Sequence, residues 1–170
     1  MARITSLADG PTELDQVWGR RPEYYAIFMK DFVDSVQRID PVIMELCRLR
    51  IAQMVESAFD LALRHIGAKN AGLGEAKIAA LRDYPSSLLF SERERIVLEF
   101  TEQWVIQSSA ISDEDVERVQ TVMSAEQFAL LCKALSMSDQ LARANSAFRL
   151  KAPAVPPPTM PGFSIAASLQ

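Results

Sequence analysis

Polar side chains that can carry acid–base chemistry are concentrated between residues 45 and 65. On one continuous helix, Ser57, Asp60 and Arg64 stand at i, i+3 and i+7, so they share one face within a sector of about 60°. An arginine fork binds a carboxylate or enolate, and a positioned carboxylate can move a proton. The spacing therefore predicts a site in which Arg64 holds an anionic substrate and Asp60 or Glu45 exchanges a proton with it, with Ser57 alongside.

A carboxylate acts as a base near neutral pH only when it is partly desolvated or crowded by another acid. Glu45, Glu56 and Asp60 can supply that crowding, although the simplest role of Glu56 is a solvated helix position. A purely structural interpretation of the same residues stays open. Asp60 and Arg64 would then be an exposed i, i+4 ion pair that stabilises the helix by about 0.3–0.5 kcal/mol and has no further role.

His65 is the sole histidine of the chain. It lies about 100° around the predicted helix from Arg64, on an apolar side, and a histidine there is more often a packing residue than a catalyst. If it faces a cavity instead, its ordinary pKa suits proton transfer near neutral pH. One histidine cannot hold a metal ion alone, and no loop motif for a hard ion is present, so we expect neither a metal nor a cofactor.

Helical periodicity dominates the sequence and no segment alternates cleanly between apolar and polar residues, which predicts an all-α protein of six to seven helices. Asp40 before Pro41, and serines at positions 91, 112 and 124, supply the start signals of helices. Gly72 and Pro85 supply stop signals. The predicted helices cover residues 13–20, 22 onward, 41–69, 74–82, 91–107, 113–123 and 124–150.

The chain has 170 residues, of which 49% are hydrophobic, and this describes one domain, over residues 1–150. Residues 151–170 form a proline-rich tail that favours an extended conformation and is either loose or held against a neighbour. The net charge of -4 and the lack of a Lys/Arg cluster argue against nucleic-acid binding. Without a signal-like or membrane-spanning apolar run, we expect a cytoplasmic protein that does not enter membranes.

Two cysteines, Cys47 and Cys132, both lie in apolar segments. Two such residues cannot make a disulfide framework, and free cysteine is among the most buried residue types. We expect both to be inert thiols packed in the core of a protein from a reducing compartment.

The segment Glu45-Leu-Cys-Arg-Leu-Arg-Ile-Ala52, the helix that ends before Gly72 and the segment Ser91-Glu-Arg-Glu-Arg-Ile-Val-Leu-Glu-Phe100 follow one another in order. With this pattern the chain resembles the carboxymuconolactone decarboxylase-like family, which includes the alkylhydroperoxidase D-like (AhpD-like) proteins. The resemblance covers most of residues 22–150. It implies a helical protomer that assembles into a trimer, a hexamer or a related symmetric homo-oligomer.

Peroxidase-type members of that family carry a Cys-x-x-Cys-x-x-x-His motif on the following helix. In this chain the resemblance puts Ser57 and Asp60 at the two cysteine positions and Arg64 at the histidine position, while Glu45 matches the family's acidic residue. Reduction of a peroxide through a dithiol needs a thiolate and a resolving thiol, which a hydroxyl and a carboxylate cannot replace. Dithiol peroxidase activity is therefore not expected.

The sequence favours a cofactor-independent lyase or isomerase of this family, acting by acid–base chemistry on a small organic acid, lactone or enone. Its predicted site residues are Glu45, Asp60, Arg64, Ser57 and His65. A non-catalytic oligomer of the same fold, binding a ligand or a partner, is the alternative, and a peroxidase that uses Cys47 or Cys132 ranks last. A cavity with Asp60 and Arg64 both facing inward would favour the enzyme.

Overall fold

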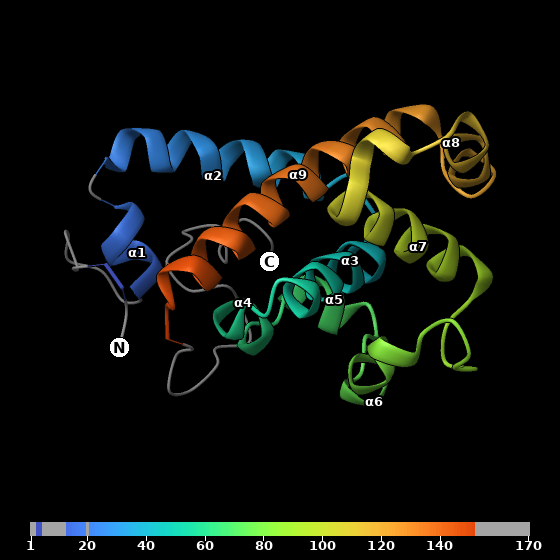
Figure 1. Ribbon diagram of the computed structural model, residues 1–170, viewed down its shortest axis with the longest axis horizontal. Coiled ribbons are helices and arrows are strands. Elements are labelled where there is room, and N and C mark those ends of the chain that lie inside the picture. The colour runs from blue at the N-terminus through green and yellow to red at the C-terminus, as the bar shows by residue number, and fades with distance from the viewer. Residues whose placement is uncertain (1–2, 5–12, 20, 152–170) are drawn as a thin grey trace.

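The computed structural model describes residues 3–4, 13–19 and 21–151 (Figure 1). Apart from Lys151, the predicted proline-rich tail lies outside the described residues. The backbone amide of Lys151 donates to Glu13 Oε2 at 2.7 Å, so the described chain ends beside its first helix.

Helices make up the secondary structure of the described part of the chain, and no strand occurs in it. This confirms the all-α prediction. The described residues contain nine α-helices and two short 3-10 helices, more than the six to seven predicted. They are α1 (Glu13–Trp18), α2 (Pro22–Val36), α3 (Pro41–Met54), α4 (Ala58–Ala62), α5 (Ile66–Asn70), α6 (Glu75–Ala79), η1 (Ala80–Asp83), α7 (Glu92–Gln107), η2 (Ser108–Ala110), α8 (Asp113–Gln120) and α9 (Ala125–Phe148).

The predicted helix starts are confirmed by their hydrogen bonds. Asp40 caps α3 by accepting from the backbone amides of Val42 and Ile43 at 2.9 and 3.2 Å. Ser91, Ser112 and Ser124 each form a reciprocal capping box with the residue three positions later. These local signals fix where α3, α7, α8 and α9 begin.

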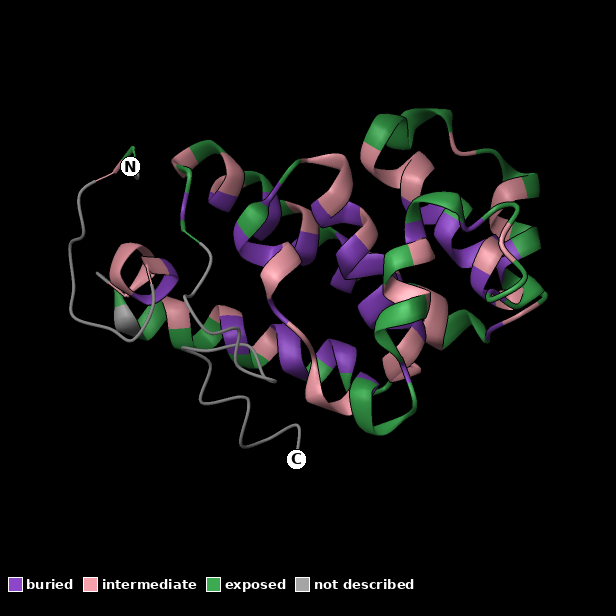
Figure 2. Ribbon diagram, turned by 90° about the horizontal axis from the view of Figure 1, so that it is seen from below, coloured by how far each residue is buried: buried purple, intermediate pink, exposed green. Residues whose placement is uncertain are grey.

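Helix α3 is the centre of the fold, in contact with α4, α5, α7 and α9, while α2 packs on α9 (Figure 1). Nearly all of its residues from Ile43 to Ala52 are buried, the charged residues Glu45 and Arg48 included. The buried segments run through the interior of the molecule, as Figure 2 shows. A helix that is buried on every side has no polar face from which its orientation in the fold could be predicted. The two buried charges on α3 therefore need partners inside the protein.

The prediction of one continuous helix over residues 41–69 is wrong. Helix α3 ends at Met54, and Glu56 adopts a left-handed conformation with φ of 55°. The Ser57 amide then donates back to the carbonyl of Ala52 at 2.9 Å, which is the bond that closes a helix with a left-handed residue. The chain continues as the short helices α4 and α5, so Ser57, Asp60 and Arg64 do not share one helical face, and Glu56 is a turn residue.

The end of this segment was predicted correctly. Gly72, with φ of 95°, closes α5, and the amide of Leu73 donates to the carbonyl of Ala68 at 2.9 Å. Glycine takes this conformation without a steric penalty. The break at Glu56 lacks that sequence signal, because glutamate seldom occupies a left-handed position.

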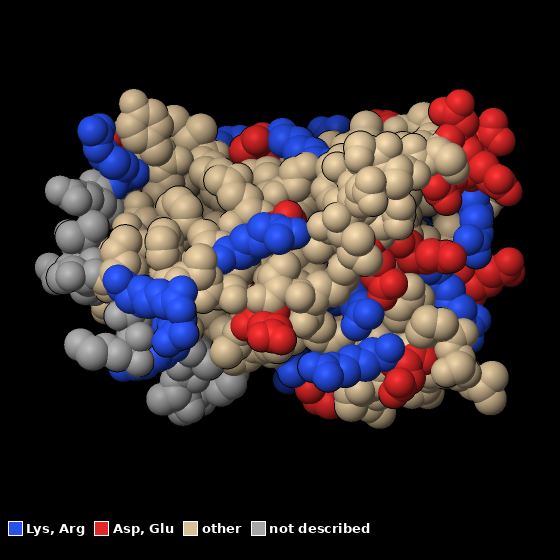
Figure 3. Space-filling view, in the orientation of Figure 1, with Lys and Arg blue, Asp and Glu red and all other residues tan. Residues whose placement is uncertain are grey.

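Acidic side chains gather at the end of the molecule where α8 lies, including Asp113, Glu114 and Asp115 in its first turn (Figure 3). Charges of both signs are mixed over the rest of the face shown. Within the described residues, no helix combines the length and the apolar character needed to cross a bilayer.

Candidate functional site

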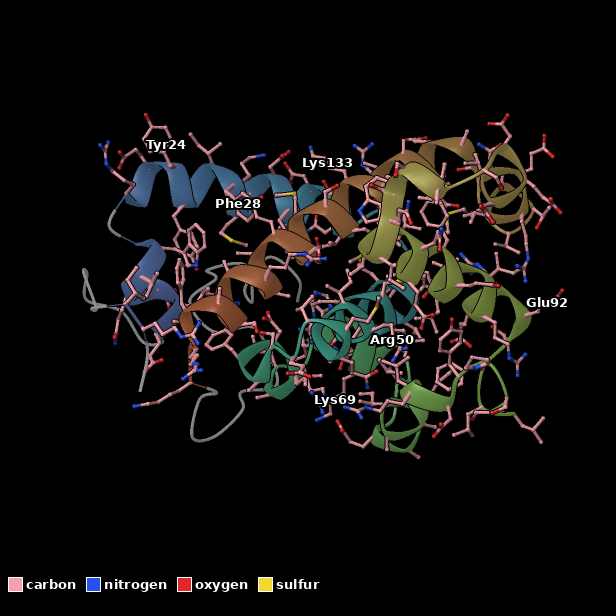
Figure 4. The ribbon with its side chains drawn as sticks, in the orientation of Figure 1. Tyr24, Phe28, Arg50, Lys69, Glu92 and Lys133 are labelled. Carbon is pink, nitrogen blue, oxygen red and sulfur yellow. The ribbon has the colours of Figure 1, made fainter. Side chains whose placement is uncertain are left out.

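A cavity of about 600 Å³ lies against α3, α5 and α6. Its wall contains the apolar residues Ala62, Ala68, Leu73 and Ile78. Lys69, labelled in Figure 4, projects from α5 on the side of the molecule where α6 lies. The ionisable residues that line this cavity are Glu45, Arg64, His65, Lys69 and Glu75. Three of the five predicted site residues therefore meet at one cavity.

Glu45 is held by Arg48 through a two-pronged, buried ion pair. Arg48 Nε donates to Glu45 Oε2 at 2.7 Å and Arg48 Nη2 donates to Oε1 at 2.8 Å. Oε1 also accepts from the backbone amide of His65 at 3.0 Å. With both oxygens engaged, Glu45 is better placed to fix the position of His65 than to exchange protons with a ligand.

Arg48 was not among the residues predicted from the sequence, yet it connects the site. Besides binding Glu45, its guanidinium donates to the carbonyl oxygens of Asp60 at 2.9 Å and Leu63 at 3.0 Å. Its position three residues after Glu45, within an apolar run, was the sequence signal that could have indicated a buried ion pair. Arg48 thereby ties α3 to the broken segment that carries His65.

Ser57 and Asp60 lie outside the cavity wall, in a separate buried cluster. Ser57 Oγ donates to Asp60 Oδ2, and Nδ2 of Asn145 on α9 donates to the same oxygen at 3.0 Å. Asn145 is a second residue that sequence reasoning missed, because it comes from a distant helix. Through these contacts, Ser57 and Asp60 pack the bend of the chain at residues 55–65 against α9.

Arg64 lines the cavity, but its carboxylate partner is Glu75 rather than Asp60. Arg64 Nε donates to Glu75 Oε1 at 3.0 Å and Arg64 Nη2 donates to Oε2 at 3.1 Å. Its Nη1 donates to the carbonyl oxygens of Leu61 and Leu63 at 2.7 and 2.8 Å. The predicted i, i+4 pair with Asp60 is wrong, because the helix that would align the two residues is broken.

His65 is half-buried in the cavity wall at the start of α5. Its ring packs so closely on Gly67 that a Cβ atom there would lie 3.1 Å from His65 Cε1 and 3.2 Å from Nδ1. The Nε2 atom is buried and has no hydrogen-bond partner among the described residues. The sequence placed His65 away from Arg64, whereas the structure puts both residues in the wall of one cavity.

Burial lowers the pKa of His65, and the positive charge of Arg48 lowers it further, while Glu45 acts in the opposite direction. The pKa falls below its ordinary value of 6.5, so the ring is predominantly neutral at pH 7. A neutral imidazole with an unpaired nitrogen can accept a proton. His65 therefore has the protonation state of a general base.

The cysteines provide no activated thiol. Burial raises the pKa of Cys47 to about 12 and that of the half-buried Cys132 to about 11. Thiolates are thus scarce at neutral pH at both positions. In the described part of the chain, no three His, Cys, Asp or Glu side chains are grouped so that they could hold a metal ion.

Comparison with known proteins places the fold but not the chemistry. No protein-family model matches the chain. The uncharacterized protein YnjA of Escherichia coli (strain K12) is 29% identical over 140 residues, which are 79% of this chain and 76% of YnjA. The crystal structure of ATU0492 from Agrobacterium tumefaciens, a protein of unknown function suggested to be the antioxidant defence protein AhpD, matches with a TM-score of 0.70.

The match to ATU0492 covers 90% of this chain and 99% of that protein at 18% sequence identity. An identity this low carries information on the fold alone. The chain thus has an AhpD-like all-α fold, as the sequence resemblance implied.

Proposed function

We propose that the chain is a cofactor-independent lyase or isomerase that acts by acid–base chemistry on a small organic acid, lactone or enone. One observation supports this most: His65, with an unpaired Nε2 and a lowered pKa, shares a largely apolar cavity with the guanidinium of Arg64. Proton transfer next to a carbonyl group requires at least a base and an anion-binding group in the same cavity.

In this proposal the His65 ring turns so that Nε2, which is buried in the structure, reaches the cavity and takes a proton from the carbon next to the substrate carbonyl. The electron pair of that C–H bond moves toward the carbonyl oxygen. Arg64, whose fork holds the carboxylate or carbonyl group of the substrate, stabilises the resulting enolate. Return of the proton to a different carbon isomerises an enone, and expulsion of a ring oxygen opens a lactone. In a decarboxylation, loss of CO2 forms the same enolate, and a proton taken up from solvent through the His65 ring completes the product.

Glu45, Ser57 and Asp60 act as positioning residues. Glu45 binds the backbone amide of His65, and the cluster of Ser57, Asp60 and Asn145 packs the bend that precedes it. Arg48 joins the two groups through Glu45 and the Asp60 carbonyl. Their loss is expected to weaken catalysis by displacing His65, not by removing a proton carrier.

The test is incubation of the full chain in D2O with a panel of unsaturated acids, lactones and enones, followed by proton NMR. We expect deuterium uptake or conversion of at least one compound. We expect Arg64→Ala to lower the rate a hundredfold or more, and His65→Gln to abolish proton transfer. Activity that survives both substitutions would contradict the proposed site.

A non-catalytic, ligand-binding or structural oligomer is the second candidate. The observation that favours it is that Asp60 does not face the cavity and that Arg64 is already paired with Glu75. It predicts binding of a carboxylate without deuterium exchange or conversion. A dithiol peroxidase is the least favoured function, because both thiols have raised pKa values.

We also propose that the protomer forms a homo-oligomer, a trimer or a hexamer, in the cytoplasm, and that it binds neither nucleic acid nor membranes. The AhpD-like fold supports the homo-oligomer only through the family resemblance. Light scattering after size-exclusion chromatography measures the mass directly, and a monomer would contradict the assembly.

A further inference from the structure

The guanidinium that the proposed function assigns to the substrate is already occupied by a carboxylate of the chain itself. Arg64 and Glu75 meet through two parallel N–H···O bonds of 3.0 and 3.1 Å. This is the geometry in which an arginine recognises a free carboxylate. A substrate carboxylate that binds Arg64 in this way must therefore replace Glu75.

The charges around the cavity favour an anion with one negative charge. Arg64 and Lys69 are positive and Glu75 is negative, whereas Glu45 is neutralised by Arg48. Hydrogen bonding from Arg64 lowers the pKa of Glu75, and the charges of Arg64 and Lys69 act in the same direction. The carboxylate of Glu75 is thus stabilised mainly by Arg64 and to a smaller extent by Lys69, and one positive charge remains in excess around the cavity.

Glu75 can leave this position without disturbing the core. Its side chain is 73% exposed, against 27% for Arg64, and α6 contains no buried residue. The helix itself is anchored through the ion pair between Lys77 and Glu94. Rotation of the Glu75 side chain toward solvent is therefore sufficient to free the fork of Arg64.

We propose that the cavity selects small monocarboxylates and that Glu75 determines this specificity. In the free protein Glu75 occupies the Arg64 fork; a monocarboxylate displaces it, and Glu75 then remains at the rim, where it repels a second negative charge. The proposal rests on the proposed function, because it deepens the role given there to Arg64. It adds two points to that function. The substrate carries one negative charge, and the side chain of Glu75 competes with it for Arg64.

The experiment is isothermal titration calorimetry of the full chain with three probes. Crotonate is a monocarboxylate, crotonamide is its uncharged isostere, and fumarate carries a second carboxylate. The variants are Glu75→Gln, Arg64→Ala and, as a control, Glu126→Gln. Glu126 also lies in the first turn of a helix and in an exposed ion pair, with Arg38 at 3.3 Å, but away from the cavity wall.

We expect the unmodified chain to bind crotonate and not crotonamide. Because an exposed ion pair is only weakly stabilising, removal of the competitor in Glu75→Gln should tighten crotonate binding by about threefold. The same variant should gain binding of fumarate. Glu126→Gln should match the unmodified chain, and Arg64→Ala should lose crotonate.

Two results would overturn the proposal, and they are distinguishable. Equal crotonate affinity in the unmodified chain and Glu75→Gln, with loss in Arg64→Ala, would remove Glu75 as the specificity determinant and leave the carboxylate site of the proposed function intact. Failure of crotonate to bind either form would contradict both the monocarboxylate preference and the assignment of Arg64 to a carboxylate.

Discussion

At the scale of single residues, the reactivity expected of His65 depends on its surroundings more than on its type. Burial in the cavity wall and the nearby charge of Arg48 disfavour the protonated ring, and the hydrogen bond from its backbone amide to Glu45 fixes its place. An isolated histidine on a helix surface would have none of these properties. The sequence could identify His65 only as a candidate, because each of these neighbours comes from folding.

The protonation of His65 can be measured directly, because the chain contains one histidine. We predict that the ring C–H signals in a proton–carbon NMR titration give a pKa below 6.5, since burial penalises the charged form. The ring is then neutral and able to accept a proton at pH 7, and general-base activity falls as pH drops through that pKa. A measured pKa above 6.5 would contradict this environment.

Arg48 is expected to be among the most sensitive positions of the fold. Arg48→Ala leaves Glu45 buried without its counter-ion and removes the bonds to the carbonyls of Asp60 and Leu63. Loss of one partner of a buried ion pair costs about 3–5 kcal/mol. Urea denaturation should show a loss of this size in the free energy of unfolding.

The control for Arg48 is Lys30→Ala, which breaks an exposed i, i+4 pair with Asp34 on α2. We expect its unfolding midpoint to stay close to that of the unmodified chain. Similar losses in the two variants would mean that the Glu45–Arg48 pair is not the connection inferred here.

At the scale of elements, some helix ends in this chain are determined by residues close by in the sequence, and others are not. Serines 91, 112 and 124 and Gly72 act on residues a few positions away, so sequence alone predicted the helix ends that they define. The bend at residues 55–65 has no such signal. It is held by Arg48 and by Asn145, which lie 12 and 85 positions from their common partner Asp60.

This difference explains which of the predicted site residues share a cavity. Glu45, Arg64 and His65 line it although the helix assumed for them is broken, since Arg64 and His65 follow α4 and the backbone amide of His65 binds Glu45. Their catalytic roles stay predictions. Ser57 and Asp60 were placed in the same cavity by assuming a continuous helix. Their separation from Arg64 follows from the break that Glu56 introduces.

The left-handed conformation of Glu56 yields a prediction about the bend. Glu56→Gly removes the steric cost of φ at 55° and should stabilise the chain by about 0.5–1 kcal/mol, offset in part by the greater freedom of glycine in the unfolded state. Thermal unfolding measures this change. The matched control is Glu117→Gly in α8, an exposed glutamate in a regular helix.

In α8 the same replacement should destabilise the chain by about 0.5–1 kcal/mol, because glycine is a poor helix former. The two substitutions are thus expected to have opposite signs. A destabilisation in both would show that the turn at Glu56 does not depend on a left-handed residue.

At the scale of the whole molecule, α2 presents a mixed surface. Met29 and Phe32 are buried against the core, whereas Tyr24 and Ile27 on the same helix are 63% and 66% exposed. For the proposed homo-oligomer, we expect the exposed part of α2 to form the subunit contact.

The prediction for assembly is that Ile27→Asp lowers the mass measured by light scattering, since a charge in an apolar contact is costly. Leu88→Asp is the control. Leu88 is 97% exposed in the loop before α7, away from α2, and its replacement should leave the mass unchanged. An unchanged mass for Ile27→Asp would exclude this face of α2 from the contact.

The central claim is that His65 and Arg64 form one carboxylate site, and the histidine signal tests it most directly. Crotonate added to the chain should shift the single histidine resonance until the site is saturated. Crotonamide should leave the resonance in place, and Arg64→Ala should abolish the response to crotonate. A histidine signal that does not shift when crotonate binds, or that shifts equally with crotonamide, would contradict a shared carboxylate site of His65 and Arg64.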